Sequence, residues 1–156
     1  DKAIGLFEKF HVFTKAELES RAEIQYETYA KAINIEAKAM IDIASKQIIP
    51  AVIKYTKSLA DTVNSVTAAG AEASVQSELL AETSGLLSDT KVALQKLIDL
   101  DKKSEEVPEG TELAHYFHEE IVPAMAELRA PVDALEMIVD KEMWPMPSYG
   151  DLMFEV

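Results

Sequence analysis

The chain has 156 residues, of which 48% are hydrophobic, and this is enough for one domain with a real core. It carries 28 acidic and 15 basic residues, and its formal net charge of −13 repels phosphate groups. We therefore expect neither nucleic acid nor a membrane surface as a partner, and no apolar run is long enough to span a bilayer. The absence of cysteine excludes disulfides, thiolate metal sites and a cysteine nucleophile, and it is compatible with a cytoplasmic protein.

The first 13 residues are rich in large apolar side chains and predict a short helix around Ile4–Phe10. In an intact domain this segment would pack against the rest of the protein, whereas in a piece of a longer chain its neighbour would be missing. The segment lacks the basic stretch and apolar block of a signal peptide, and the chain begins with Asp1 rather than methionine. We therefore expect a processed chain or a part of a longer one.

Residues 14–70 predict one very long helix, because apolar residues recur every three or four positions along it. Thr14 and Glu17 match a capping box at its start, and Gly70 suits its end. Pro50 lacks the amide hydrogen that a helix needs, so we expect a bend there. The apolar stripe crosses Pro50 in phase, which favours one bent helix over two helices with a turn. The stripe consists of Tyr26, Ala30, Ile33, Ala37, Met40, Ala44, Ile48, Ala51, Tyr55, Leu59, Val63 and Val66.

A second helix is predicted at residues 71–103 and a third at residues 111–140. Gly85 and the hydroxyl residues around it weaken the second helix, so we expect a kink, a thin patch or a local break in its middle. The charged sequence DKKSEEVPEG between the two helices predicts a loop. The third helix contains Pro123 and Pro131, but its apolar stripe passes both in phase, which indicates a bent helix or two abutting ones.

The predicted fold is all-α. Each apolar stripe needs another stripe to cover it, and the economical arrangement is an antiparallel helical bundle with one very long, Pro-kinked helix. Residues 15–49 alone would span roughly 50 Å as a helix, so the bundle is expected to be elongated. Residues 1–156 are treated as a single helical domain.

The tail, residues 141–156, differs in kind from the helices. Pro145 and Pro147 favour an extended conformation, and three aromatic residues, Trp144, Tyr149 and Phe154, could anchor such a segment in a groove. The tail could fold back on its own bundle, or it could dock on another domain or subunit.

The strongest candidate for chemistry is a di-metal site held by carboxylates and histidines in a helical bundle. Such sites use Glu-x-x-His pairs, and the chain has two, Glu8 with His11 and Glu112 with His115; His118 follows one turn later. No glutamate-bearing helix precedes the first pair, so the chain order of the usual pattern fails. In the alternative interpretation, His115 and His118 are ordinary surface residues of an acidic helix, and this is the interpretation we favour.

Other catalytic patterns are missing from the sequence. The five glycines are scattered and form no phosphate-binding loop, and no serine lies in a G-x-S-x-G elbow. Carboxylates are so abundant that no pair stands out as an acid and base couple. We therefore assign no catalytic and no cofactor-binding residue.

Several short motifs resemble one enzyme family. In the tail they are Leu135-Glu136-Met137, Val139-Asp140-Lys141-Glu142-Met143-Trp144-Pro145 and Tyr149-Gly150-Asp151-Leu152. In the helices they are Ile33-Asn34-Ile35-Glu36-Ala37, Met40-Ile41, Ile49-Pro50-Ala51 and Arg129-Ala130-Pro131. Together they resemble the C-terminal end of type III glutamine synthetases. The resemblance runs from about Glu19 to Val156, with mild departures at Met146, Ser148 and Met153 and little signal in residues 71–103.

The resemblance implies a parent ligase that joins ammonia to glutamate with ATP and a divalent metal ion. It implies that the catalytic domain precedes Asp1 and is missing here, so this chain alone would be inactive. The implied role is structural, in shaping a large ring-stacked homo-oligomer, with the catalytic domain and neighbouring subunits as partners. Two alternatives remain: a free-standing helical scaffold and the di-metal bundle.

Overall fold

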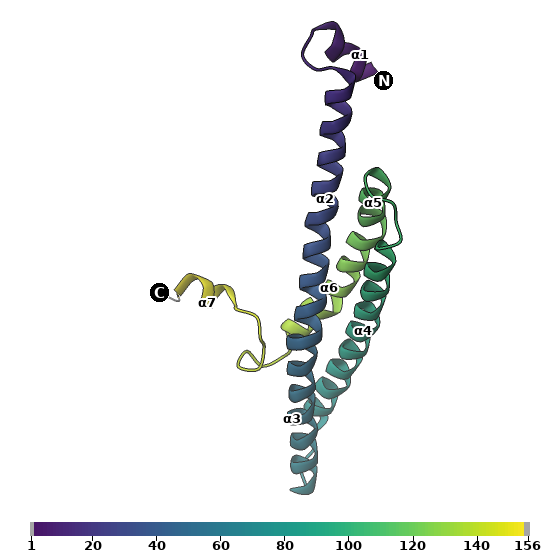
Figure 1. Cartoon of the computed structure of the whole chain (residues 1–156). Helices are drawn as coiled ribbons and strands as arrows, with labels where there is room; N and C mark the ends of the chain where they lie inside the picture. The colour runs from purple at the N-terminus through teal and green to yellow at the C-terminus, as the bar shows by residue number, and fades with distance from the viewer. Residues whose placement is uncertain (1, 155–156) are drawn as a thin grey trace.

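The computed structural model describes residues 2–154, apart from the side chain of Tyr149, and this part is helical without any strand. Figure 1 shows three rods that run up and down beside one another, which confirms the predicted all-α, elongated bundle. The first rod consists of α2 (Lys15–Ile43), η1 (Ala44–Ile48) and α3 (Ile49–Ala68), and the second is α4 (Ser74–Ser104). The third consists of α5 (Thr111–Tyr116), η2 (Phe117–Ile121) and α6 (Val122–Glu136). Two short helices, α1 (Lys2–Lys9) and α7 (Tyr149–Phe154), lie near the chain ends.

The first rod begins and ends where its sequence predicts. The Thr14 amide donates to Glu17 Oε2 over 2.8 Å and the Glu17 amide donates to Thr14 Oγ1 over 3.3 Å, so the capping box is present. The hydrogen bonds that the amide and the hydroxyl of Thr14 donate to the Glu17 carboxylate lower the pKa of Glu17. At the other end, Gly70 has a φ of 81°, in the left-handed region that glycine enters without cost.

Two prolines in the rods are each preceded by one turn of π-helix. The Ile49 amide donates to the carbonyl of Ala44, five residues back, and Pro50 follows directly. The Val122 amide likewise donates to the carbonyl of Phe117, and Pro123 follows. In a regular α-helix a proline ring collides with the carbonyl four residues before it, and here that carbonyl belongs to the π-turn in both cases. The wider turn takes in one extra residue, so the rod continues through Pro50, as the in-phase stripe predicts.

The core lies where the three rods meet, in two clusters. The larger one receives small residues from the first rod, which let the third rod approach closely, and large ones from the others. Its buried members are Ala30, Ala37, Ala44, Leu94, Leu97, Phe117, Ile121, Ala124 and Leu128. The second cluster lies further along and contains Ile48, Val52, Leu135 and Val139. Both clusters draw on residues of the π-turns, so these turns are part of the packing.

The structure differs from the predictions at three places. Helix α4 is unbroken through Gly85, without the expected local break, and Thr83 before Gly85 and Leu94 after it are both buried. The third rod ends at Glu136 rather than at residue 140, since the amides of Met137 and Ile138 bond only three residues back and tighten the last turn. The tail is irregular after that point, but it ends in the short helix α7 rather than staying extended.

The N-terminal segment forms the predicted short helix but lies apart from the bundle. Helix α1 contains no buried residue and folds back only onto the start of α2 (Figure 1). The rings of Phe7 and Phe13 lie 5.8 Å apart, and the Arg21 guanidinium lies 4.5 Å from the centre of the Phe13 ring. Figure 1 also shows that the first part of α2 extends beyond the end of α5.

Candidate interaction site in the C-terminal tail

The tail is fixed to the bundle by Trp144. This half-buried residue packs against the second core cluster, which contains Ile48, Val52 and Leu135. Its backbone amide donates to the carbonyl of Asp140 over 2.9 Å, which closes a turn directly after the cluster. The indole therefore contacts its own bundle, and Trp144 is an anchor in cis.

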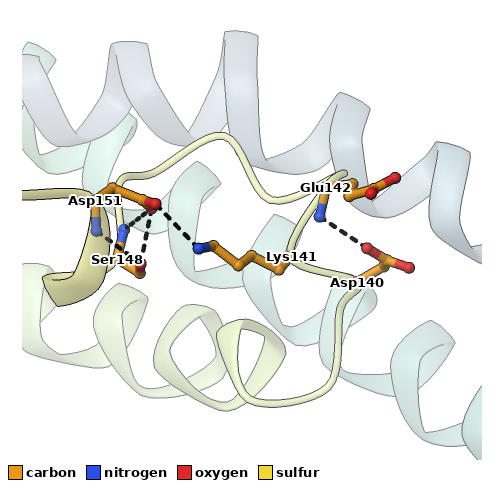
Figure 2. A network of polar contacts seen from close by, with 5 residues as sticks. All are labelled: Asp140, Lys141, Glu142, Ser148 and Asp151. Atoms are coloured by element: carbon orange, nitrogen blue, oxygen red, sulfur yellow. Dashed lines mark hydrogen bonds and ion pairs between the residues drawn. The ribbon is translucent and has the colours of Figure 1, made fainter. Parts of the chain in front are cut away.

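Beyond Trp144, a small polar network folds the end of the tail (Figure 2). Ser148 caps α7: its amide and hydroxyl both donate to Asp151 Oδ2 over 2.7 Å, and the Asp151 amide donates back to Ser148 Oγ over 3.3 Å. Lys141 Nζ lies 3.0 Å from Asp151 Oδ1 and so ties the cap to the turn after α6. In that turn, Asp140 Oδ1 accepts a hydrogen bond of 2.7 Å from the Glu142 amide.

The same network sets the ionisation of Asp151. The hydrogen bonds from the side chain and backbone of Ser148, and then the one from Lys141, lower the pKa of Asp151 to about 2. The carboxylate is therefore held in its charged form at neutral pH, as a helix N-cap partner requires. Its task in this geometry is to shape the tail.

The folded end of the tail presents apolar side chains to solvent. Leu152, Met153 and Phe154 are 67%, 68% and 79% exposed, and Figure 1 shows α7 standing away from the three rods. The three aromatic residues predicted as anchors are thus divided. Trp144 packs on the bundle, Phe154 is exposed, and the side chain of Tyr149 lies outside the described part of the structure. A tail that is capped yet apolar on its surface has the character of a docking element.

A second exposed apolar surface lies at the N-terminal end of the first rod. We call residues 2–13 the N-terminal hook; its most exposed large side chains are Leu6, Phe10 and Val12. Among these residues Glu8 is the single acidic one, set against Lys2 and Lys9. The hook is therefore an apolar surface with little net charge, because Glu8 and the preceding Asp1 balance the two lysines in the sequence.

The candidate metal ligands do not come together. Glu8 Oε1 accepts a hydrogen bond from the Lys15 amide, whereas His118 Nδ1 lies 3.2 Å from the hydroxyl of Tyr29, about 20 Å further along α2. His115 is exposed and its Nδ1 lies 3.9 Å from Glu119 Oε1. In residues 2–154 no three histidine, aspartate or glutamate side chains, Glu112 included, are grouped so that they could hold a metal ion. The di-metal alternative thus has no ligand set in this geometry.

Sequence reasoning missed the cap of α7. The cap was readable, because Ser148 and Asp151 have the S-x-x-D spacing of a capping box. The two prolines before it pointed to an extended chain instead.

Comparison with known proteins finds similarity to one enzyme family. A family profile described as "Glutamine synthetase C-terminal domain" matches residues 1–67, which include the hook, α2, η1 and nearly all of α3. A "Type-3 glutamine synthetase" of Dictyostelium discoideum is 32% identical over 160 residues, which cover 99% of this chain and 22% of that protein. By these matches the chain is similar to the C-terminal part of glutamine synthetases, the type-3 enzyme among them. The family resemblance predicted from the tail and helix motifs is confirmed.

Two bacterial relatives of this domain show the same proportions. The "Glutamine synthetase" of Butyrivibrio fibrisolvens is 29% identical over 100% of this chain and 23% of that protein. The "Glutamine synthetase" of Bacteroides fragilis is 28% identical over 92% of this chain and 20% of that protein. The domain thus spans about a fifth of the length of the curated relatives it matches. Across residues 2–154, none of the helices combines the length and the hydrophobicity needed to cross a membrane.

Proposed function

We propose that this domain is a structural and assembly part of a cytoplasmic glutamine synthetase and is not catalytic by itself. In this proposal the catalytic part joins ammonia to glutamate with ATP and a divalent metal ion, and the domain contacts both that part and neighbouring subunits of a homo-oligomer. The observation that carries the proposal is a rod with its own core and two uncovered apolar surfaces, the N-terminal hook and α7. Uncovered apolar surfaces of this kind mark sites of protein association.

The charged groups of the domain support a structural role. The two carboxylates whose pKa values are lowered, Glu17 and Asp151, both hold helix caps. Ion pairs one helical turn apart, such as Lys15 with Glu19 and Arg129 with Asp133, lie on exposed helix faces. Perturbed carboxylates in an enzyme site usually serve a reaction, but these are occupied in shaping the ends of helices.

The relatives favour a ligase domain over a free-standing scaffold, because each of them is named as a glutamine synthetase and each is about five times as long. Their names describe those proteins, and the transfer to this domain is part of the proposal.

The first test concerns catalysis. The purified domain is assayed for glutamine formation and for ATP hydrolysis with glutamate, ammonia, ATP and Mg²⁺. We expect neither product above a no-protein control. Glutamine formation by the domain alone would refute the non-catalytic role.

The second test concerns assembly and uses a longer enzyme that carries this domain. The domain is deleted in one variant and replaced by a flexible linker in another, and the mass of each particle is measured by light scattering. We expect both variants to form smaller particles than the parent enzyme. Particles with the parent's subunit number would overturn the assembly role.

A further inference from the structure

Methionine is concentrated at the C-terminal end of the chain. The chain has six methionines and no cysteine, so the thioether is its only sulfur group. Residues 1–136 hold two of the six, and the other four fall within residues 137–153. These four C-terminal methionines are Met137, Met143, Met146 and Met153. Most of the sulfur of the domain thus lies in and just before the tail.

Exposure also separates the C-terminal methionines from the two in the rods. Met137 and Met153 are 85% and 68% exposed, and Met143 and Met146 are each 38% exposed. The two methionines of the rods are half-buried and pack against the larger core cluster. An oxidant in solution reaches exposed sulfur atoms first, so the C-terminal methionines are the accessible targets.

Two of these methionines flank the anchor of the tail. Met143 directly precedes Trp144 and Met146 follows it by two residues. The amides of Met143 and Trp144 both donate to the carbonyl of Asp140 over 2.9 Å, so Met143 belongs to the turn that seats the indole. At 38% exposed, both methionines are covered over most of their surface.

The anchor itself depends on apolar packing. Trp144 packs against the second core cluster, but its indole Nε1 is buried and has no hydrogen-bond acceptor among the described residues. A buried N–H without an acceptor forgoes the hydrogen bond that it would make to water, and release of the indole would recover it. The attachment is therefore weaker than that of a fully paired side chain, and a small loss of packing can shift it.

We propose that peroxide oxidises Met143 and Met146 to sulfoxides and thereby releases Trp144 from the second core cluster. In each reaction the sulfur takes one oxygen atom from hydrogen peroxide: the O–O bond breaks, an S–O bond forms, the sulfur loses two electrons and the other oxygen leaves as water. The apolar side chain becomes polar, and burying a polar group without a partner is unfavourable, so the oxidised side chains favour solvent.

The release is reversible and independent of assembly. Methionine sulfoxide reductases return the sulfur to the thioether with two electrons from a dithiol, and the oxygen leaves as water. Oxidation of Met137 and Met153 leaves the indole in place, because both side chains already lie largely in solvent. The proposal goes beyond the assembly role, since it concerns how the tail is attached to its own rods.

The experiment treats the folded domain with hydrogen peroxide and follows two signals. Peptide mass spectrometry assigns each added oxygen to its residue, and the emission of Trp144, the sole tryptophan, reports on the anchor. We expect the C-terminal methionines to react at least several-fold faster than Met40 and Met125. The emission should shift to longer wavelength as the indole enters water, and methionine sulfoxide reductases with dithiothreitol should restore it.

Double variants separate the flanking sulfur atoms from the others. In Met143→Leu with Met146→Leu the emission should stay unchanged under peroxide, because leucine keeps the apolar volume and is not oxidised. Met137→Leu with Met153→Leu is the matched control and should shift as the unchanged domain does. Met143→Gln with Met146→Gln replaces both thioethers by polar side chains and should show the shifted emission without peroxide. Circular dichroism checks that each variant keeps its helices.

Other outcomes overturn the proposal. A shift that persists in Met143→Leu with Met146→Leu, or that disappears in the matched control, excludes the flanking methionines as its cause. Complete oxidation of Met143 and Met146 without a change in emission shows that the anchor tolerates the sulfoxides. Reaction of Met40 and Met125 as fast as the C-terminal methionines contradicts control by exposure. None of these results bears on the assembly role, which is tested by deleting the domain from a longer enzyme.

Discussion

Asp151 shows how one side chain shapes a segment of this domain. It accepts hydrogen bonds from the amide and hydroxyl of Ser148 and pairs with Lys141, so it joins the start of α7 to the turn that follows α6. Without this carboxylate, a helix of six residues would have little to hold it, since short helices are marginal in water.

The pH dependence of the tail follows from this arrangement. The pKa of Asp151 is lowered from 3.8 to about 2 in the folded tail, so an unfolded tail binds a proton more readily. The contribution of Asp151 to α7 is complete above about pH 4 and is lost as the pH falls through about 2. We expect the side-chain carboxyl resonance of Asp151 in NMR to titrate near pH 2, together with the amide of Gly150. Titration of Asp151 near its ordinary value of 3.8 would contradict the cap.

At the level of residues, the sequence predicts local caps well and distant pairings poorly. Thr14, Glu17 and Gly70 behave as their spacing indicates, because a cap depends on three or four neighbouring residues. The histidines at positions 11 and 118 lie on different elements, and their separation depends on how the hook and the rods are placed. Spacing along the chain carries no information about that distance.

Among the elements, α4 has a simple test at Gly85. Glycine costs up to about 1 kcal/mol in a helix, yet α4 passes through it, and a Cβ at this position meets nothing within 4 Å. Gly85→Ala should therefore raise the free energy of unfolding by about 0.5–1 kcal/mol, measured by urea denaturation. Gly70→Ala is the control: its φ of 81° strains alanine, so it should lower stability by about 1 kcal/mol. A loss of stability in Gly85→Ala would mean that α4 needs its glycine.

The π-turn before Pro50 makes a prediction about chain length. Because η1 holds one residue more than an α-helical turn, removing the exposed Gln47 together with Pro50→Ala should yield a regular helix whose flanks keep their faces. We expect this variant to unfold cooperatively, with a stability within about 1.5 kcal/mol of Pro50→Ala alone. The same measurement on a deletion of exposed Lys91, in α4, provides the comparison.

Helix α4 has no such turn to absorb a lost residue. Deleting Lys91 rotates one part of α4 by about 100° against the other, which takes buried Leu94 and Leu97 out of register with the residues before them. That variant should fail to fold. An equal loss of stability in the two deletion variants would show that η1 does not accommodate the loss of a residue.

The existence and order of the rods follow from the sequence, because each stripe has the period of a helix and each needs a partner. The π-turns could not be predicted in the same way. Apolar residues recur every three or four positions, so one extra residue does not visibly interrupt the stripe. Whether a proline breaks the helix depends on the backbone geometry around it, which the stripe does not show. Helix α7 was not predicted, because Pro145 and Pro147 directly before Ser148 indicate an extended chain.

In the whole molecule, the first rod is packed against the others along only part of its length. The first rod spans about 80 Å from Lys15 to Ala68, but residues 15–22 are exposed except for half-buried Leu18, and no neighbouring rod covers them. A single helix of this length is marginal without packing. The elongated shape was predictable from the length of the stripe; the lack of cover over its first part was not, because the third helix is shorter than the first.

Hydrogen exchange should reveal this difference in packing along the first rod. In the dilute domain, amides of residues 18–22 should exchange at least about 100-fold faster than those of residues 37–48, which lie in the core of the bundle. Mass spectrometry of peptides from the two ranges measures the ratio. Equal protection would mean that residues 18–22 are covered in solution by a contact already present at low concentration.

The position of the one tryptophan gives the domain a built-in optical probe. Trp144 is the sole indole in the chain, and it lies where the tail leaves the second core cluster. Its emission therefore reports on that junction alone, without labels and without a background from other indoles. Docking, acid or proteolysis that displaces α7 can therefore be followed by the emission of Trp144. Changes at the far end of the first rod do not alter that signal.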